Sequence, residues 1–323
     1  MNKTVVDWLL EESNPSIRYR TLVELLHEDP AARAVREAKS HIPDSPAVRD
    51  LFARMHPDGY WLETNPRTGI TVGAGVEYGA YATTHFCLAY LAELGLDRAH
   101  PLVHKAADRY LNLQKPDGDF WNHFSCLNGY NIRNFILLGY RDDPRLRKTI
   151  ALMLATWRPD GGYLCDMHEK RRKNSRSCIR GCAKMLMAYS LLPELWAHER
   201  CQTLVEYFLG RNCIFRLRKP KELVRRDIVQ THFPIAWQTS ALEILWSLSR
   251  MGLGTHSATK AAWEALDSKR TDDGNYVMDW TPTQALLKAG KRGQPNKWTT
   301  FYALQALQYR ANKGPAGVAA ENQ

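Results

Sequence analysis

The chain of 323 residues lacks several features that would place it in a common class. It has no run of about 18 apolar residues, the length that a helix needs to cross a bilayer, and its first residues form no apolar signal-peptide core. We therefore expect a cytoplasmic protein with no membrane span. It also has no Asp-Asp-x-x-Asp magnesium motif, no Walker phosphate loop and no Gly-x-Ser-x-Gly nucleophile elbow.

Cysteines are few, seven in all, and their odd number argues against a disulfide scaffold. Reduced thiols suit metal binding or catalysis, although a buried core thiol is the common alternative. The net charge is +10, with dense basic clusters at residues 170–176 and 216–226. Neither cluster interleaves aromatic residues and no nucleic-acid motif is present. We expect no nucleic-acid partner and interpret the clusters as solvated loops or an entrance for an anionic substrate.

What the sequence does have is a repeated turn. Four Asp-Gly pairs are each followed, one or two residues later, by an aromatic residue; their glycines are Gly59, Gly118, Gly161 and Gly274. The gaps between them are 59, 43 and 113 residues, so the last gap must contain one degenerate repeat. Glycine supplies the positive φ that ends a helix, and the aromatic residue can plug the gap between neighbouring hairpins.

Each turn separates two kinds of predicted helix. The helices before the turns are amphipathic and half-exposed: Pro46 to Met55, Pro101 to Gln114, Pro144 to Trp157, Ala197 to Arg211 and His256 to Arg270. The helices after the turns are apolar on most of their circumference: Tyr81 to Leu94, Leu127 to Leu138, Ile179 to Leu192, Ile235 to Met251 and Trp298 to Tyr309. A sixth pair comes first, Val5 to Glu11 and Ser16 to Leu26, with Asn14-Pro15 starting its second helix.

Six outer and six inner helices predict an all-α fold, an α6/α6 double-walled barrel or toroid, in which each hairpin buries its faces against its neighbours. We expect one domain over residues 1–323 with a disordered tail at 314–323. The repeat resembles that of squalene–hopene-type terpene cyclases and protein prenyltransferase β subunits. The resemblance covers residues 14–309 and implies the toroid fold, whereas function varies widely on one scaffold.

Possible metal ligands gather where the inner helices begin. Cys126, Cys165, Cys178 and His232 lie at equivalent positions of neighbouring hairpins, and three thiolates with an imidazole suit zinc. Prenyltransferase β subunits resemble this chain at Cys178 and His232, two of their zinc ligands, but Arg176 stands where they have the third, an aspartate. Cys182, Asp166 and His168 are alternative ligands. Buried core thiols with a hydrogen-bonded histidine are the alternative to any metal.

Other residues near the inner helix starts are candidates for the chemistry. We expect catalytic roles for Tyr60, Tyr78, His85 and Asp279, and substrate binding by Arg18, Trp61 and Trp280. Aromatic rings can line an apolar cavity, and an arginine can hold an anionic group. Paired carboxylates for glycoside hydrolysis, from Glu63, Glu77 and Asp279, are a minor alternative. The Asp-Asp strings at 142–143 and 272–273 lie in turns, which argues against a protonation-type cyclase.

The sequence therefore predicts an enzyme with a thiolate-rich zinc site at the mouth of a central cavity, acting on an apolar or anionic small substrate. Zinc with an open position would activate a nucleophile or polarise the substrate. The alternative from another class is a non-catalytic toroid that binds a lipid or small ligand, with structural metal or none. A protein–protein scaffold is a third possibility. Protein prenyltransferase activity is not expected, because the aspartate ligand is missing.

Overall fold

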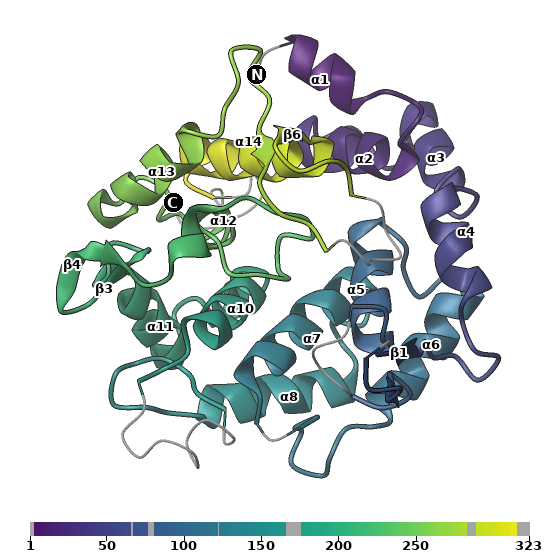
Figure 1. Cartoon of the computed structure of the whole chain (residues 1–323), viewed down its shortest axis with the longest axis horizontal. Helices are drawn as coiled ribbons and strands as arrows, with labels where there is room; N and C mark the ends of the chain where they lie inside the picture. The colour runs from purple at the N-terminus through teal and green to yellow at the C-terminus, as the bar shows by residue number, and fades with distance from the viewer. Residues whose placement is uncertain are drawn as a thin grey trace.

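The structure, a computed structural model, describes residues 3–65, 67–76, 81–121, 123–165, 176–282 and 289–314. It is mostly helical (Figure 1). Strands in the described ranges form three two-stranded antiparallel pairs, none of which the sequence predicted. They are β1 (Glu63–Thr64) with β2 (Thr71–Val72), β3 (Phe215–Arg216) with β4 (Lys219–Leu223), and β5 (Val277–Met278) with β6 (Gln294–Pro295).

The predicted inner helices are present and are buried on nearly all sides. They are α5 (Thr84–Glu93), α7 (Ser125–Leu137), α10 (Ile179–Ser190), α12 (Ala241–Arg250) and α14 (Lys297–Asn312). The prediction began α12 six residues early, at Ile235. Residues 235–237 are apolar and buried, but residues 235–239 are not helical. The helix begins where the Ser240 side chain accepts a hydrogen bond from the Glu243 N–H.

The predicted outer helices bury one face only, as their amphipathic pattern indicates. They are α1 (Lys3–Leu9), α4 (Pro46–Ala53), α6 (Pro101–Leu111), α8 (Pro144–Ala155), α11 (Glu199–Leu209) and α13 (Lys260–Asp267). Proline at the first position starts α4, α6 and α8, where its missing N–H costs nothing. One helix was missed, α3 (Arg33–Ser40), whose apolar stripe is only Val35 and Ala38.

Shorter helical segments complete the description. The first inner segment is α2 (Pro15–Arg20), which continues as a π-helix, η1 (Thr21–Leu25). Three 3-10 helices lie at η2 (Pro193–Leu195), η3 (Arg226–Val229) and η4 (Ser257–Thr259). None of the described helices is long and apolar enough to cross a membrane. The tail predicted from residue 314 lies, beyond Gly314, outside the described residues.

The turn glycines behave as predicted. Gly59, Gly118, Gly161 and Gly274 all have positive φ, between 77° and 96°. The first three also pack against the following outer helix, where a Cβ on Gly118 would lie 2.8 Å from the Lys148 carbonyl oxygen. In the degenerate repeat the positive φ falls on Asn212 and Cys213, at 43° and 64°. The aromatic residues that follow the four glycines, Trp61, Phe120, Tyr163 and Tyr276, are buried, as plugs between hairpins should be.

The inner helices pack in sequence order. α5 contacts α7, α7 packs extensively against α10, α10 contacts α12, and α12 packs against α14. α14 also contacts α1, α2 and η1, so the end of the chain returns to its beginning, where yellow meets purple in Figure 1. Each buried helix additionally contacts an amphipathic one, as α5 does with α6 and α12 with α13.

A buried set of charges joins η1 and its neighbours to α5, α7 and α14. We call Arg20, Glu24, Glu93, Arg133 and Tyr302 the ionic centre. Arg20 bonds to both Glu24 oxygens, at 2.6 and 2.9 Å, and to Glu93 at 3.1 Å. Arg133 lies 2.8 Å from the other Glu93 oxygen. The Tyr302 hydroxyl accepts from both arginines, at 2.9 and 3.0 Å, and donates to Glu93. Two guanidinium groups thus face two carboxylates.

Candidate functional site

Aromatic rings from separate parts of the chain form a wall beside the starts of the inner helices. We call Tyr81, Phe86, Tyr90, Trp237 and Trp280 the aromatic wall. Tyr81 stacks on Trp237 with ring centroids 4.6 Å apart, and Phe86 and Tyr90 meet Trp237 edge-on at 5.0 and 4.4 Å. The Trp280 ring lies 6.1 Å from Tyr81. Such offset and edge contacts are the favourable geometries for aromatic pairs.

Two basic side chains lie one turn apart on α10, next to this wall. Arg180 Nη2 donates to the Trp237 carbonyl oxygen at 2.7 Å. Lys184 Nζ lies 2.8 Å from both carboxylate oxygens of Glu243 and donates to the Gln238 carbonyl oxygen at 3.1 Å. Burial is the main cause that lowers the pKa of Lys184 to about 8, with Glu243 opposing the shift and Arg180 adding to it.

A third basic side chain, Arg225, extends this group. It pairs with Asp227 at 2.6 Å, and its pKa is raised mainly by that hydrogen bond, while the charge of Arg180 opposes the shift. We call Arg180, Lys184 and Arg225 the cationic cluster. It faces two carboxylates, Glu243 and Asp227, so positive charge is in excess among these five groups.

Three predicted zinc ligands, Cys126, Cys165 and Cys178, lie close enough for their charges to interact. Burial raises the pKa of Cys126 to about 11, Arg180 lowers it, and Cys178 and Cys165 raise it further. Cys182 instead belongs to the core: it is fully buried, its sulfur accepts from the Tyr163 N–H at 3.2 Å, and burial raises its pKa to about 12.

Both predicted site histidines are buried and neutral at pH 7. Burial lowers the pKa of His85 to about 3 and that of His232 to about 4. His85 Nδ1 lies 3.0 Å from Asn131 Oδ1. His232 Nε2 lies 3.0 Å from the carbonyl oxygens of Ile235 and Gln238. A metal at His232 Nε2 would have to displace these backbone contacts.

A formed metal centre is not seen in the described part of the chain. No group of three or more His, Cys, Asp or Glu side chains there lies close enough together to hold one ion. Cys126, Cys165 and Cys178 are therefore neighbours without forming a ligand cage, and zinc stays a prediction. Asp166 and His168, the alternative ligands, lie outside the described residues.

Most other predicted site residues make contacts that hold the fold together. Asp279 accepts from the Thr231 N–H at 3.0 Å and pairs with Lys269 at 2.9 Å. The Trp61 indole N–H donates to the Leu51 carbonyl oxygen at 2.7 Å.

Tyr60 stacks on His56 at 4.2 Å and lies under Arg109 at 4.5 Å. Arg18 pairs with Glu12 at 2.8 Å. These contacts of Tyr60 and Arg18 do not involve the aromatic wall or the cationic cluster. Trp280 does belong to the wall, and Tyr78 and Glu77 lie outside the described residues.

Sequence reasoning missed Lys184 and Glu243. The available signal was a single charge inside an otherwise apolar helix, as in Cys182-Ala183-Lys184-Met185-Leu186. A charged side chain at such a position is buried at high cost unless it has a partner, so it marks a network or a site.

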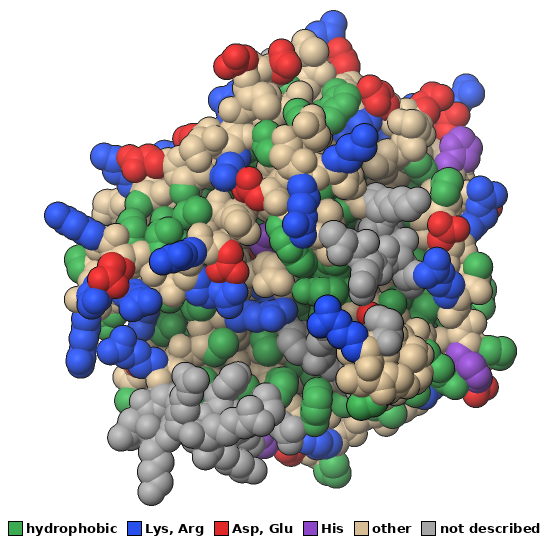
Figure 2. Space-filling view, viewed as in Figure 1, with side chains coloured by type: hydrophobic (Ala, Val, Ile, Leu, Met, Phe, Trp, Pro, Cys, Tyr) green, Lys and Arg blue, Asp and Glu red, His purple; other side chains and the backbone are tan. Residues whose placement is uncertain are grey.

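Exposed basic charge gathers elsewhere, over the β3–β4 hairpin, at the left of Figure 2. Arg216 and Lys219 both pair with Glu222, at 3.5 and 2.7 Å. Leu217, at the hairpin turn, is 54% exposed. The hairpin thus fits one of the two interpretations of residues 216–226, a solvated loop, whereas Arg225 in the same stretch belongs to the cationic cluster.

Comparisons with known proteins concern the fold. No protein-family model and no curated protein sequence matches the chain. Among solved structures, a glycosyl hydrolase family 88 protein from Bacteroides vulgatus is 10% identical, with 94% of this chain and 91% of that chain covered and a TM-score of 0.51. A polysaccharide lyase is 11% identical, with 96% and 97% covered and a TM-score of 0.49. A type II terpene cyclase from Scytonema is 14% identical, with 85% and 97% covered and a TM-score of 0.33.

These neighbours have helical folds of the α/α toroid type, and the first supports the same type of fold for this chain. The predicted mostly helical, toroid-type fold is confirmed at this level. Membership of the terpene cyclase or prenyltransferase families is not shown, and a likeness at 10% identity says nothing about the substrate.

Proposed function

We propose that this chain is an enzyme whose six helical hairpins close a double-walled barrel, and that it acts on a small substrate with an anionic group and an apolar part. The observation that carries the proposal is the clustering of three basic side chains, Arg180, Lys184 and Arg225, directly beside the aromatic wall. A guanidinium group binds phosphate or carboxylate in a planar, two-pronged geometry, and the rings offer apolar surface for the rest of the ligand.

Different residues would bind the anionic and the apolar part of the ligand. Arg180, oriented by its bond to the Trp237 carbonyl oxygen, would hold the anionic group. Tyr81 and Trp280, the half-buried rings of the wall, would hold the apolar part, with the fully buried Trp237 behind Tyr81. Gln238 couples the two halves, because its side chain donates to the Tyr81 hydroxyl at 3.2 Å while its carbonyl accepts from Lys184. His85 and His232, neutral at pH 7, would face the ligand as uncharged polar groups.

Binding is tested with decyl phosphate, inorganic phosphate and decanol by calorimetry. We expect decyl phosphate to bind more tightly than either fragment, since it engages both the cations and the wall. Arg180→Met should weaken it by about tenfold to a hundredfold, the value of hydrogen bonds to a charged group. Arg147→Met on α8, which removes an exposed arginine paired with Asp142, is the matched control. Equal weakening in both variants would refute the proposed site.

Zinc is a separate proposal, supported by the proximity of Cys126, Cys165 and Cys178 and by the affinity of thiolates for zinc. Metal binding releases thiol protons and would offset the raised pKa of Cys126. Elemental analysis of purified protein should find about one zinc per chain, lost in Cys178→Ala and retained in Cys201→Ala, where the thiol is a fully buried core residue. Metal-free folded protein would refute it.

The alternative is a toroid that binds its ligand without chemistry. It is favoured by one observation: Cys126 and the two histidines have pKa values that leave them uncharged and weakly reactive at pH 7. Ligand copurified with the protein and released unchanged on denaturation would support this alternative. A product whose formation stops in Arg180→Met would support the enzyme.

A further inference from the structure

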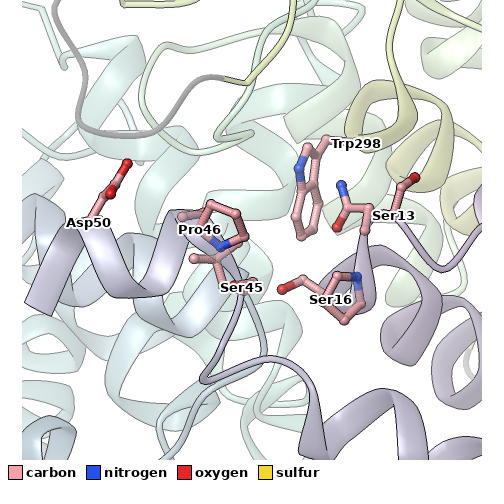
Figure 3. A pocket seen from close by; sticks show the side chains of 10 residues that line it. Ser13, Ser16, Ser45, Pro46, Asp50 and Trp298 are labelled. Atoms are coloured by element: carbon pink, nitrogen blue, oxygen red, sulfur yellow. The ribbon is translucent and has the colours of Figure 1, made fainter.

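A cavity of about 350 Å³ lies between the starts of α2, α4 and α14 and shares no residue with the cationic cluster or the aromatic wall. Figure 3 shows Trp298 reaching into it above Ser45 and Pro46, with the Ser16 side chain at its floor. Its volume is at the lower end of the range of about 300–1,000 Å³ that is usual for small-molecule sites. It suits a single ring rather than a lipid tail.

Ser16 supplies a hydroxyl group to this cavity. The residue is 2% exposed, and within the described part of the chain its hydroxyl makes no hydrogen bond. In Figure 3 the hydroxyl points into the cavity. A hydroxyl in this position costs free energy unless a ligand or water supplies a partner, so the cavity offers a hydrogen bond to whatever enters it.

Trp298 adds an oriented donor. One face of its indole stacks on Phe233 at 4.4 Å, and Arg20 lies 6.0 Å from its ring centroid. These neighbours hold in place the ring, which lines the cavity. Its indole N–H makes no hydrogen bond to any described residue. An indole N–H can only donate, so its partner must carry an oxygen or another acceptor.

The other polar groups at the cavity extend this set. Asn14 uses its Oδ1 to accept from the Ile17 N–H at 3.1 Å, which leaves its amide NH₂ as a donor. Asp50 is exposed at the rim and forms no ion pair with the described residues. Leu94 and Pro46 supply apolar surface. Hydroxyl, amide and indole donors with one carboxylate and apolar walls match a ring that bears several hydroxyls.

We propose that this cavity binds a single sugar ring that is neutral or carries an amino group. The hydroxyl groups of such a ring both donate and accept, as Ser16, Asn14 and Asp50 require, and its C–H face packs on apolar surface. Asp50 sets the charge preference: it attracts an amino sugar and repels a uronic acid. Because Asp50 is exposed, each of these preferences should amount to about two- to fivefold in affinity.

The test is calorimetric titration of the full chain with D-glucosamine, D-glucose and D-glucuronate. We expect affinity to fall in that order, and Asp50→Asn to bring the three values together. Ser16→Ala should weaken D-glucose binding by about three- to tenfold, whereas Ser268→Ala, an exposed serine on α13, should not. Arg180→Met should leave sugar binding unchanged, since it belongs to the other site.

A steric block makes the test independent of any single hydrogen bond. Ala47→Trp places a large ring on the cavity wall and should abolish binding of all three sugars while the circular dichroism spectrum stays that of the unaltered chain. The proposal is overturned if none of the sugars binds, if binding survives Ala47→Trp, or if the order of affinities is the same in Asp50→Asn.

Discussion

The ionic centre and the cationic cluster differ in burial and in the partners of their charges. Arg20, Glu93 and Arg133 are buried, whereas in the cationic cluster Lys184 is buried, Arg180 is half-buried and Arg225 is exposed. In the ionic centre two arginines face two glutamates, and Tyr302 bonds to three of these four groups. In the cationic cluster Lys184 pairs with Glu243 and Arg225 pairs with Asp227, and thiols lie near them. Burial is costly for any charge, so the mutual pairing of the ionic centre is explained by its role in holding helices together. The clustering of three basic side chains in the other set supports the proposed anionic ligand.

Among the variants that test this comparison, Glu93→Gln in the ionic centre should have the largest effect on the free energy of unfolding. Glu93 is fully buried and faces both Arg20 and Arg133. Removing its charge leaves two buried guanidinium groups with a single carboxylate, so we expect a loss of about 3–5 kcal/mol in the free energy of unfolding. Urea denaturation measures it. Glu194→Gln, which breaks an exposed pair with Arg141, should cost at most about 1 kcal/mol.

Acid should weaken the chain through its two buried histidines. An unfolded histidine binds a proton near pH 6.5, whereas folded His85 and His232 do so only near pH 3 and 4. Between these values the unfolded state binds more protons, so the free energy of unfolding falls as pH falls. We expect a loss of about 2 kcal/mol per histidine between pH 7.5 and 5. Urea denaturation at the two pH values measures the total loss from both histidines, which should be about half as large in His232→Gln. A total loss that is unchanged in this variant would contradict the low pKa of His232.

The contact between α7 and α10, which positions Lys184, depends on Gly129. A Cβ at that position would lie 2.7 Å from the Lys184 carbonyl carbon and 2.8 Å from its oxygen. Alanine in a helix normally stabilises relative to glycine. In Gly129→Ala, however, the new Cβ would clash with backbone that cannot move aside, so we expect the free energy of unfolding to fall by about 1–3 kcal/mol. In Gly181→Ala the new Cβ would clash mainly with the Ser125 side chain, which can rotate. The midpoint of thermal denaturation should therefore fall less in Gly181→Ala than in Gly129→Ala.

The smallest change in stability is expected for a double variant of the Lys184–Glu243 pair in the cationic cluster. Replacing both members of the Lys184–Glu243 pair, as Lys184→Met with Glu243→Gln, removes two charges together and leaves neither unpaired. Such replacements are often neutral, so the free energy of unfolding should change by no more than about 1 kcal/mol. Binding of decyl phosphate should nevertheless weaken. Large destabilisation with unchanged binding would make the pair a structural one, like the ionic centre.

Much of the fold follows from local sequence signals. Proline at helix starts, the helical period of the apolar residues and the Asp-Gly turns placed both kinds of helix within a few residues of their observed bounds. The start of α12 was misplaced because an apolar run does not distinguish a helix from a buried loop, and residues 235–239 are the latter. The three strand pairs were not predicted, because most of their strands are two residues long and show no alternating pattern.

The site was harder to predict, because its contacts join residues far apart in the sequence. Lys184 meets Glu243 and Tyr81 meets Trp237, pairs that no spacing rule connects. Cys126, Cys165 and Cys178 lie close enough for their charges to interact, but their role as zinc ligands stays a prediction, because a zinc site depends on side-chain geometry within a few tenths of an ångström. The side chains of Trp61 and Asp279 make packing and loop contacts in the structure, which no sequence spacing indicated.

Whether the cationic cluster is open to a ligand is tested most directly by locating an anion in crystals soaked with selenate, using the anomalous scattering of selenium. The account predicts an ordered anion within hydrogen-bonding distance of Arg180 in the unaltered chain, none in Arg180→Met, and none at the ionic centre. Selenate found only over the exposed β3–β4 hairpin, with the surroundings of Arg180 empty, would contradict it.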